Sequence, residues 1–306
     1  MKKLPLQRYR RAADFISTHA RLVDQRLFEY YFYNGPAEAV LEALTPYQNE
    51  DGGVAHGIEP DIQTKVSNPI STSVALQYAR AAGASWRHPF IQKAMGYLTS
   101  VYSEYGFWPL KIREMNEAPH AEWWHFEKKA ETFEANPGAE IIGYFHCYPQ
   151  VLESDLFPIW HEQVFTYLEG SGPLEMHEAL CFLRLADLMP EPGKSHILDA
   201  LRPHIRATVT TDPSKWGGYC AKPLLFAPAP DSPFACMLER HVLKNLDYEV
   251  ASQQEDGSWM PYWKWGQYED VWETEAKKEW AGWLTVTTLK ALADYDRIEG
   301  LVPEKR

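Results

Sequence analysis

One short stretch occurs twice in this chain and constrains its fold more than any other feature. It reads Gln48-Asn49-Glu50-Asp51-Gly52 in the first copy and Gln253-Gln254-Glu255-Asp256-Gly257 in the second. Each copy lies between two apolar segments with helical spacing. An Asp-Gly pair after a helix predicts a sharp reversal, because Gly adopts a positive φ without steric cost and Asp accepts hydrogen bonds from nearby backbone N–H groups. Two matched turns predict an array of helical hairpins.

The rest of the chain follows a helical pattern, interrupted by Gly and Pro. Asn68-Pro69 and Asn136-Pro137 are typical helix starts, with Asn as the cap and Pro in the first turn. No segment alternates with the period of a strand. The residues between 104 and 135 and between 212 and 233 are predicted to be irregular. The predicted helices cover about 7–33, 36–44, 68–82, 88–103, 136–145, 153–170, 174–189, 194–209, 234–252 and 275–295.

This pattern predicts a single all-α domain over residues 1–306, built of antiparallel helical hairpins. Aromatic and acidic residues concentrate in one set of connections. For this reason we prefer closure into a ring, an α/α-toroid around a central pocket, and keep an open superhelix as the alternative.

The charge and composition exclude several classes of partner. The net charge is −12 and no basic stripe is present, which argues against nucleic acid and anionic membranes. No apolar run is long enough to span a bilayer, and no apolar region follows the basic N-terminus. The four cysteines lack a CxxC pair and are expected to be reduced thiols in a cytoplasmic protein. The oligomeric state stays open.

The two turns carry a resemblance to a known superfamily. Gln253-x-x-Asp256-Gly257-Ser258-Trp259 resembles the Gln-Trp (QW) repeat of terpenoid cyclases, and Gln48-x-x-Asp51-Gly52-Gly53 resembles the same repeat without its Trp. Protein prenyltransferase β subunits have related turns. The chain is most similar to a small bacterial branch of this superfamily, which shares stretches like 56–61, 175–178 and 279–283. The resemblance implies an α/α-toroid and a soluble enzyme acting on an apolar small molecule.

Three motifs of that superfamily are missing here. The chain has no Asp-x-Asp-Asp acid motif, no Asp-Asp-x-x-Asp cluster for a diphosphate-bound magnesium ion, and no Asp-x-Cys with a distant His for zinc. The resemblance therefore carries over the fold, whereas it does not carry over those specific activities.

The first candidate for chemistry is the loop from His56 to Asp61. Pro60 stiffens it, so that Glu59 and Asp61 are presented on the same side. Two neighbouring carboxylates push each other's pKa values apart and leave one as acid and one as base. We assign Glu59 and Asp61 as catalytic and His56 as substrate-binding, against the alternative that they cap helix ends.

Two further candidates begin predicted helices. Glu175 to Glu178 follow Gly172-Pro173, where acids are favoured by the helix dipole alone. That explanation covers Glu175, whereas His177 and Glu178 are assigned as catalytic. In the helix after Asn136, Glu140 and His146 are assigned as substrate-binding residues facing the pocket.

No metal or other cofactor is predicted. The chain has 11 His, but no His-x-x-x-His lies on a predicted helix and His-Glu-x-x-His is absent. His56, His146 and His177 meet with a carboxylate only if the fold brings them together, which the sequence leaves open.

Aromatic residues supply the remaining candidates. With 12 Trp and 17 Tyr, the chain carries many rings with polar tips. Those in predicted loops are harder to explain as core, because loops face solvent. Flat rings at a pocket mouth either stack on sugars or stabilise cations. We assign them to an aromatic-lined pocket as substrate-binding residues: Trp123, Trp124, Tyr219, Trp259 and Trp263.

Three functions follow. The first is a terpenoid-cyclase-like or prenyltransferase-like enzyme that uses carboxylate acid–base chemistry on an apolar small molecule. The second is a carbohydrate-active hydrolase or lyase, because paired carboxylates among Trp platforms suit sugars equally. The third is a non-catalytic module that binds a peptide or metabolite.

Overall fold

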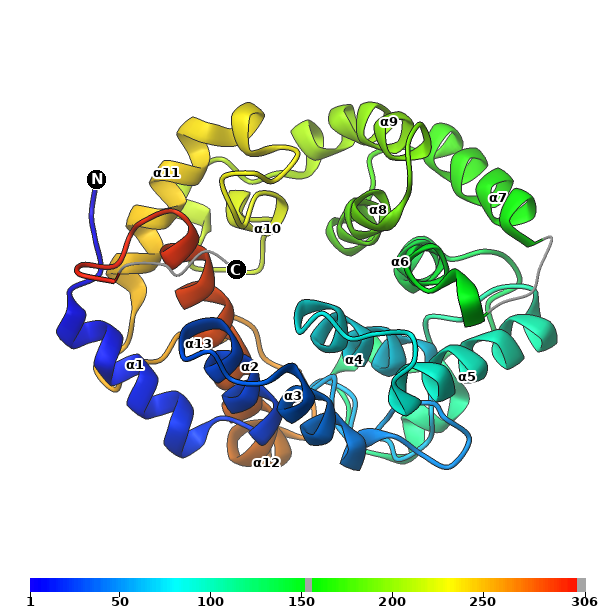
Figure 1. Cartoon of the computed structure of the whole chain (residues 1–306), viewed down its shortest axis with the longest axis horizontal. Coiled ribbons are helices and arrows are strands. Elements are labelled where there is room, and N and C mark those ends of the chain that lie inside the picture. Colours follow the sequence, from blue (N-terminus) through cyan, green and yellow to red (C-terminus); the bar gives the residue numbers. More distant parts are fainter. Residues whose placement is uncertain (152–155, 302–306) are drawn as a thin grey trace. The chain divides into compact units, whose positions relative to one another are not determined.

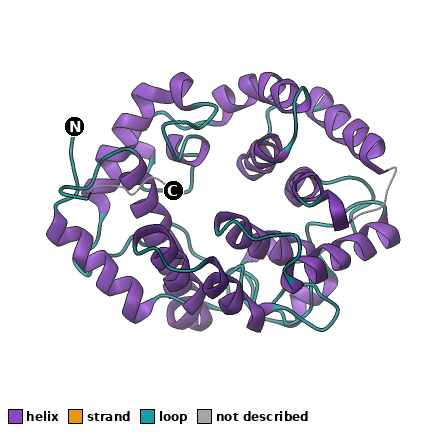
Figure 2. Cartoon of the chain, viewed as in Figure 1, coloured by secondary structure: helices purple, strands orange, loops and turns teal. Residues whose placement is uncertain are grey.

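The computed structural model describes residues 1–151 and 156–301. Within these ranges the chain is all-α, as predicted, and contains no strand (Figure 2). The predicted helix over 153–170 begins partly outside the described residues. The helices are α1 Leu6–His19, α2 Leu22–Phe32, α3 Ala37–Leu44, α4 Pro69–Ala81, α5 Pro89–Tyr105, α6 Ala135–Cys147, α7 Leu156–Gly170, α8 Met176–Leu188, α9 Gly193–Thr208, α10 Pro223–Phe226, α11 Ala235–Ser252, α12 Glu269–Val271 and α13 Lys277–Asp294.

The chain divides into two compact units. The first unit contains residues 1–43, 209–264 and 269–306, and the second contains residues 44–208 and 265–268. The prediction of one domain, like the closure of the hairpins into a ring, stays a prediction. Each unit is described separately below.

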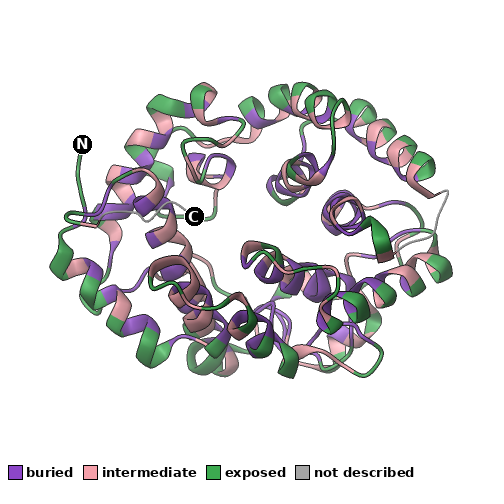
Figure 3. Cartoon of the chain, in the orientation of Figure 1, coloured by how far each residue is buried: buried purple, intermediate pink, exposed green. Residues whose placement is uncertain are grey.

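In the second unit, four helices pack side by side. Helix α6 packs against α4 and α8, and α8 packs against α9 (Figure 1). Helix α6 is buried nearly all round, because most of its residues are apolar and its one carboxylate, Glu140, is paired with Arg184. By contrast, α9 buries only Ile197, Leu201 and Ile205, one residue per turn, and leaves its other residues partly or fully exposed (Figure 3). The row α4–α6–α8 is therefore the buried layer of this unit.

In the first unit, α1 and α2 pack against α13, and α10 packs against α11. The chain ends of this unit are joined, because Leu4 forms an isolated parallel bridge with Ile298. A π-helical turn over Trp272–Ala276 connects α12 to α13.

The first copy of the repeated turn holds a helix of the second unit. Gly52 has a φ of 89°, as predicted, and the Asp51 carboxylate accepts from the N–H of Gly53 at 2.9 Å. The Gln48 carboxamide donates to the Gly52 carbonyl and to the Phe90 carbonyl in α5, both at 3.0 Å. The Gln side chain thus joins the turn to α5.

The second copy does the same in the first unit. Gly257 has a φ of 96°, and Asp256 accepts from the N–H of Ser258 at 2.9 Å. Gln253 donates to the Gly257 carbonyl at 2.8 Å and to the Arg8 carbonyl in α1 at 3.1 Å. The repeat is therefore a structural device that fastens a loop to a neighbouring helix.

One predicted helix is wrong in its extent. The segment 7–33 forms two helices, because the chain turns extended at Ala20, where ψ is 157°, and at Arg21. Helix α13 passes close to this corner: a Cβ placed on Gly282 would lie 2.8 Å from the Cβ of Ala20. The helical spacing of apolar residues continues through the break, which is why the sequence predicted one helix. The close approach of α13 to Ala20 accounts for the break.

Candidate functional site

A buried carboxylate lies at the centre of the row α4–α6–α8. Glu140 of α6 is 1% exposed. Its oxygens accept from the Tyr144 hydroxyl at 2.6 Å, from Arg184 Nη1 at 2.9 Å and from Gln77 Nε2 at 3.3 Å. A charge in this position is tolerated only because it is paired and hydrogen-bonded. Three helices therefore meet at one carboxylate, within one unit.

The partners of Glu140 are held by helix geometry. Tyr144 lies one turn after Glu140, on the same face of α6. Burial, and then the charge of Glu140, raises the pKa of Tyr144 well above its ordinary value, so its hydroxyl stays a donor. The Arg184 side chain is 39% exposed, in contrast to Glu140. It therefore extends from the buried pair to solvent.

One face of α8 carries three titratable side chains of this site. His177, Cys181 and Arg184 are spaced by four and three residues, which places them in a line. The Cys181 thiol lies 3.6 Å from Asn136 Oδ1 and 3.7 Å from Glu140 Oε2. Burial, and then Glu140, raises its pKa well above the ordinary value. Cys181 is therefore a protonated thiol and not a nucleophile.

His177 is exposed at the surface. Protein atoms around its ring nevertheless exclude part of the water that would hydrate the charged imidazolium. Burial lowers its pKa, Glu175 opposes that shift, and the positive charge of Arg184 adds to it. Its pKa is thus below the ordinary value of about 6.5, and the imidazole is neutral near pH 7. A neutral, accessible imidazole is able to take up a proton.

The neighbouring Glu178 has a structural role at the start of α8. Its carboxylate accepts from the N–H of Glu175 at 2.9 Å, while Glu175 accepts from the N–H of His177 at 2.7 Å. These reciprocal bonds form a capping box. Glu178 also accepts from the Tyr167 hydroxyl. Both of its oxygens are therefore occupied, and its catalytic assignment stays a prediction.

The predicted carboxylate pair lies in the packed loop of the second unit. Glu59 is 9% exposed and Asp61 is 4% exposed. Asp61 Oδ1 accepts from the Trp265 indole N–H at 2.6 Å. Asp61 thus fastens the segment 265–268 to this loop. His56, with a φ of 60°, is exposed and its Nε2 lies 2.8 Å from Asn49 Oδ1.

We expect Asp61→Asn to lower stability by about 1–3 kcal/mol, because the buried Trp265 N–H then loses a charged acceptor. Glu59→Gln should cost less than about 1 kcal/mol. Urea unfolding followed by tryptophan fluorescence measures both. If instead both variants keep wild-type stability and lose turnover of a substrate, the catalytic assignment of Glu59 and Asp61 is supported over the structural one.

The two Trp residues of the loop 104–135 separate in the structure. Trp124 packs on a small core of Ile62, Ile70 and Met115, whereas Trp123 is 39% exposed. Only Trp123 thus presents a substantial surface to a ligand.

His146 pairs with a histidine that the sequence did not indicate. Its Nε2 atom lies 3.0 Å from Nε2 of His161 in α7. Burial, and then His161, lowers the pKa of His146 to about 4. No contact between His146 and His56 or His177 is found among the described residues.

The aromatic residues of the first unit that were assigned to substrate binding also divide into a core residue and more accessible ones. Trp259 is buried, and its indole N–H donates to the Glu249 carbonyl at 3.0 Å. Trp263 is half-buried and packs edge to face against Trp280, Tyr262 and Tyr219. These rings form an aromatic cluster in the first unit, whereas Trp259 belongs to its core.

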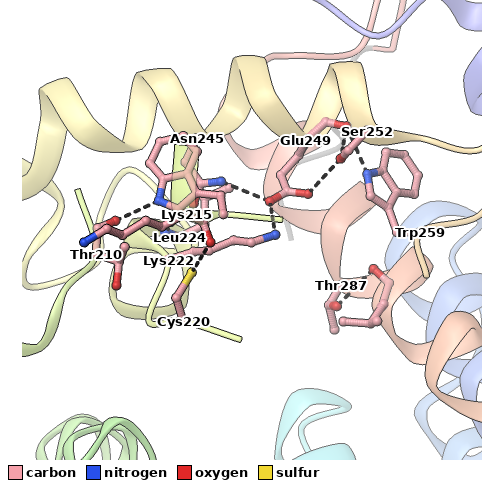
Figure 4. A network of polar contacts seen from close by, with 12 residues as sticks. Thr210, Lys215, Cys220, Lys222, Leu224, Asn245, Glu249, Ser252, Trp259 and Thr287 are labelled. Atoms are coloured by element: carbon pink, nitrogen blue, oxygen red, sulfur yellow. Dashed lines mark hydrogen bonds and ion pairs between the residues drawn. The ribbon is translucent and has the colours of Figure 1, made fainter. Parts of the chain in front are cut away.

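A second buried carboxylate, beside this cluster, was not predicted from the sequence. Glu249 accepts from Lys222 Nζ and from Asn245 Nδ2, both at 3.0 Å (Figure 4). The Lys222 ammonium also lies over the rings of Tyr248 and Tyr262. Every group here has a partner from its own surroundings, which indicates a structural role in joining α10 to α11.

The sequence analysis singled out Glu140 and His177, whose assigned roles stay predictions, and did not single out Arg184, Tyr144, Gln77 or Cys181. The signal for Tyr144 was its spacing of four from Glu140, and the signal for Arg184 was its spacing of seven from His177. Gln77 lies on another helix and left no signal.

Comparisons of the chain with protein families, with curated proteins and with solved structures found no match. Among residues 1–151 and 156–301, no group of three or more His, Cys, Asp or Glu side chains is placed to hold a metal ion. No helix in these ranges is both long and apolar enough to cross a membrane.

Proposed function

We propose that this chain is a small-molecule enzyme whose acid–base step takes place on α8, with His177 as the general base. The observation that carries the proposal is an accessible imidazole, neutral near pH 7, on the same helix face as Arg184, whose guanidinium is fixed by the buried Glu140. A base needs a pKa near or below the working pH, and a fixed cation stabilises negative charge that develops in the reaction.

The charge of Arg184 favours one reaction class over another. A partly exposed guanidinium repels a cationic intermediate and attracts a developing oxyanion. The site therefore suits proton abstraction next to a carbonyl group, or attack on a carbonyl, better than the carbocation chemistry of terpenoid cyclases. The resemblance to that superfamily then supports only the fold and an apolar substrate body.

The carbohydrate-active alternative has less support at this site. Glycoside hydrolysis uses two carboxyl groups, one of them a proton donor. Here Glu140 is bonded to Arg184, Tyr144 and Gln77, and Glu178 is bonded in the capping box and to Tyr167. Neither carboxylate is available as the proton donor.

A ligand screen gives the first test. We expect neutral carbonyl compounds with an apolar body to raise the unfolding temperature more than isoprenoids, isoprenoid diphosphates or oligosaccharides do, because a ligand of the folded state stabilises it. A hit that also shifts the unfolding temperature of His177→Gln, but is not turned over by wild type, would indicate a binding module.

With a substrate identified, His177→Gln should lower kcat by about 10²–10⁴-fold and change stability by less than about 1 kcal/mol. The matched control is His196→Gln on α9, an exposed histidine beside Glu169.

In wild type, kcat/KM should fall as the pH drops through a pKa below about 6.5, because protonation removes the base and the pKa of His177 is lowered. Unchanged turnover in His177→Gln would reject the proposal.

A further inference from the structure

A histidine pair lies away from the α8 site. His146 belongs to the last turn of α6, and His161 lies on α7. Their Nε2 atoms are 3.0 Å apart, their ring centroids are 5.1 Å apart, and their planes differ by 15°. Because the nitrogens are much closer than the centroids, the two rings approach through their Nε2 edges.

This separation is that of two imidazole ligands on one metal ion. With metal–nitrogen distances of about 2.0–2.1 Å, neighbouring ligands lie about 2.9 Å apart at a right angle and about 3.3–3.4 Å apart at a tetrahedral angle. The observed 3.0 Å is closer to the right angle. Tetragonal sites with nitrogen and oxygen ligands are typical of copper(II) and nickel(II).

Apolar rings hold the pair in place. The Phe157 ring lies 4.7 Å from the His146 ring, and the Phe165 ring lies 6.5 Å from the His161 ring. Both histidines are only partly buried, so an ion can enter and the remaining coordination positions are open to water. The described residues supply no third side chain of the kinds that bind metals.

We propose that His146 and His161 form a two-histidine site for copper(II) or nickel(II), completed by solvent, which joins α6 to α7. In the metal-free state one histidine donates a hydrogen bond from its Nε2 to Nε2 of the other. Binding of the ion through both Nε2 atoms replaces this bond, and the donor ring then carries its proton on Nδ1, so that both imidazoles stay neutral. The site is separate from His177 and does not depend on the proposed function.

The test is a titration of the tag-free full chain with copper(II) chloride, using glycine as a competing ligand. We expect one equivalent to bind more tightly than all others, with an electron paramagnetic resonance signal from two imidazole nitrogens. His146→Gln and His161→Gln should each weaken this binding at least tenfold. The control variant His204→Gln on α9 should bind as wild type does.

Two outcomes would overturn the proposal. One is equally tight binding in His161→Gln, or in the double variant His146→Gln/His161→Gln, which would mean adventitious surface binding. The other is a signal from a single nitrogen. Circular dichroism of the variants shows whether each is folded. A parallel titration with nickel(II) checks the stoichiometry with an ion that the thiols of the chain do not reduce.

Discussion

Gly52→Ala and Gly257→Ala should each lower the free energy of unfolding by at least about 4 kcal/mol, a large part of the roughly 5–15 kcal/mol that stabilises an ordinary domain. A Cβ on Gly52 would lie 2.3 Å from the Lys93 carbonyl oxygen, and a Cβ on Gly257 would lie 2.5 Å from the Arg11 carbonyl oxygen. These neighbours are helix backbone and have no free rotation by which to move away. Strain from the positive φ adds about 1–2 kcal/mol.

Gly106→Ala and Gly300→Ala are the matched controls. Both glycines have a positive φ, of 75° and 68°, but a Cβ on either would meet nothing within 4 Å. Their free energy of unfolding should fall by only about 1–2 kcal/mol, which is the backbone strain that alanine introduces at a positive φ. Urea unfolding measures all four variants, and limited proteolysis shows whether Gly52→Ala opens the second unit and Gly257→Ala the first. Equal losses in all four would mean that backbone strain alone, and not close packing, demands glycine at the repeated turns.

The fold was predictable where a local rule determines the structure. The Asn68 side chain accepts from the N–H of Ser71 at 2.8 Å, as expected for a cap, and Pro69 begins α4. The turns at Gly52 and Gly257 likewise depend on a few adjacent residues. The break at Ala20 was not predictable in this way, because its cause lies on α13. How the helices are grouped into units depends on contacts between residues far apart in the chain, and such contacts leave no periodic pattern in the sequence.

The candidate site was predictable only in part, for the same reason. Position at a helix start singled out His177 and Glu178, and the structure then separates them: His177 is accessible, whereas Glu178 caps the helix. The charge pairs follow no sequence rule. Arg184 and Glu140 are on different helices, and in the first unit Lys222 lies just before α10 whereas its partner Glu249 is on α11.

Arg184→Met should lower the free energy of unfolding by about 3–5 kcal/mol, because it leaves the buried carboxylate of Glu140 without its positive partner. Tyr144 and Gln77 still donate to Glu140, but neither carries a charge. Glu140→Leu should cost less, about 1–2 kcal/mol, for two reasons. The Arg184 side chain is already 39% exposed and can be hydrated, and the Tyr144 hydroxyl can donate to the Ser73 carbonyl, which lies 3.3 Å away.

The double variant Glu140→Leu/Arg184→Met separates pairing from burial. It removes both charges, so its loss should be smaller than the sum of the two single losses and smaller than that of Arg184→Met alone. Urea unfolding of the four proteins gives this cycle. Additive losses would show that Glu140 and Arg184 do not interact. A greater loss in Glu140→Leu than in Arg184→Met would show that the guanidinium, and not the carboxylate, is the charge that the fold cannot leave unpaired. In that case Glu140 would serve to hold Arg184 in place for the chemistry on α8.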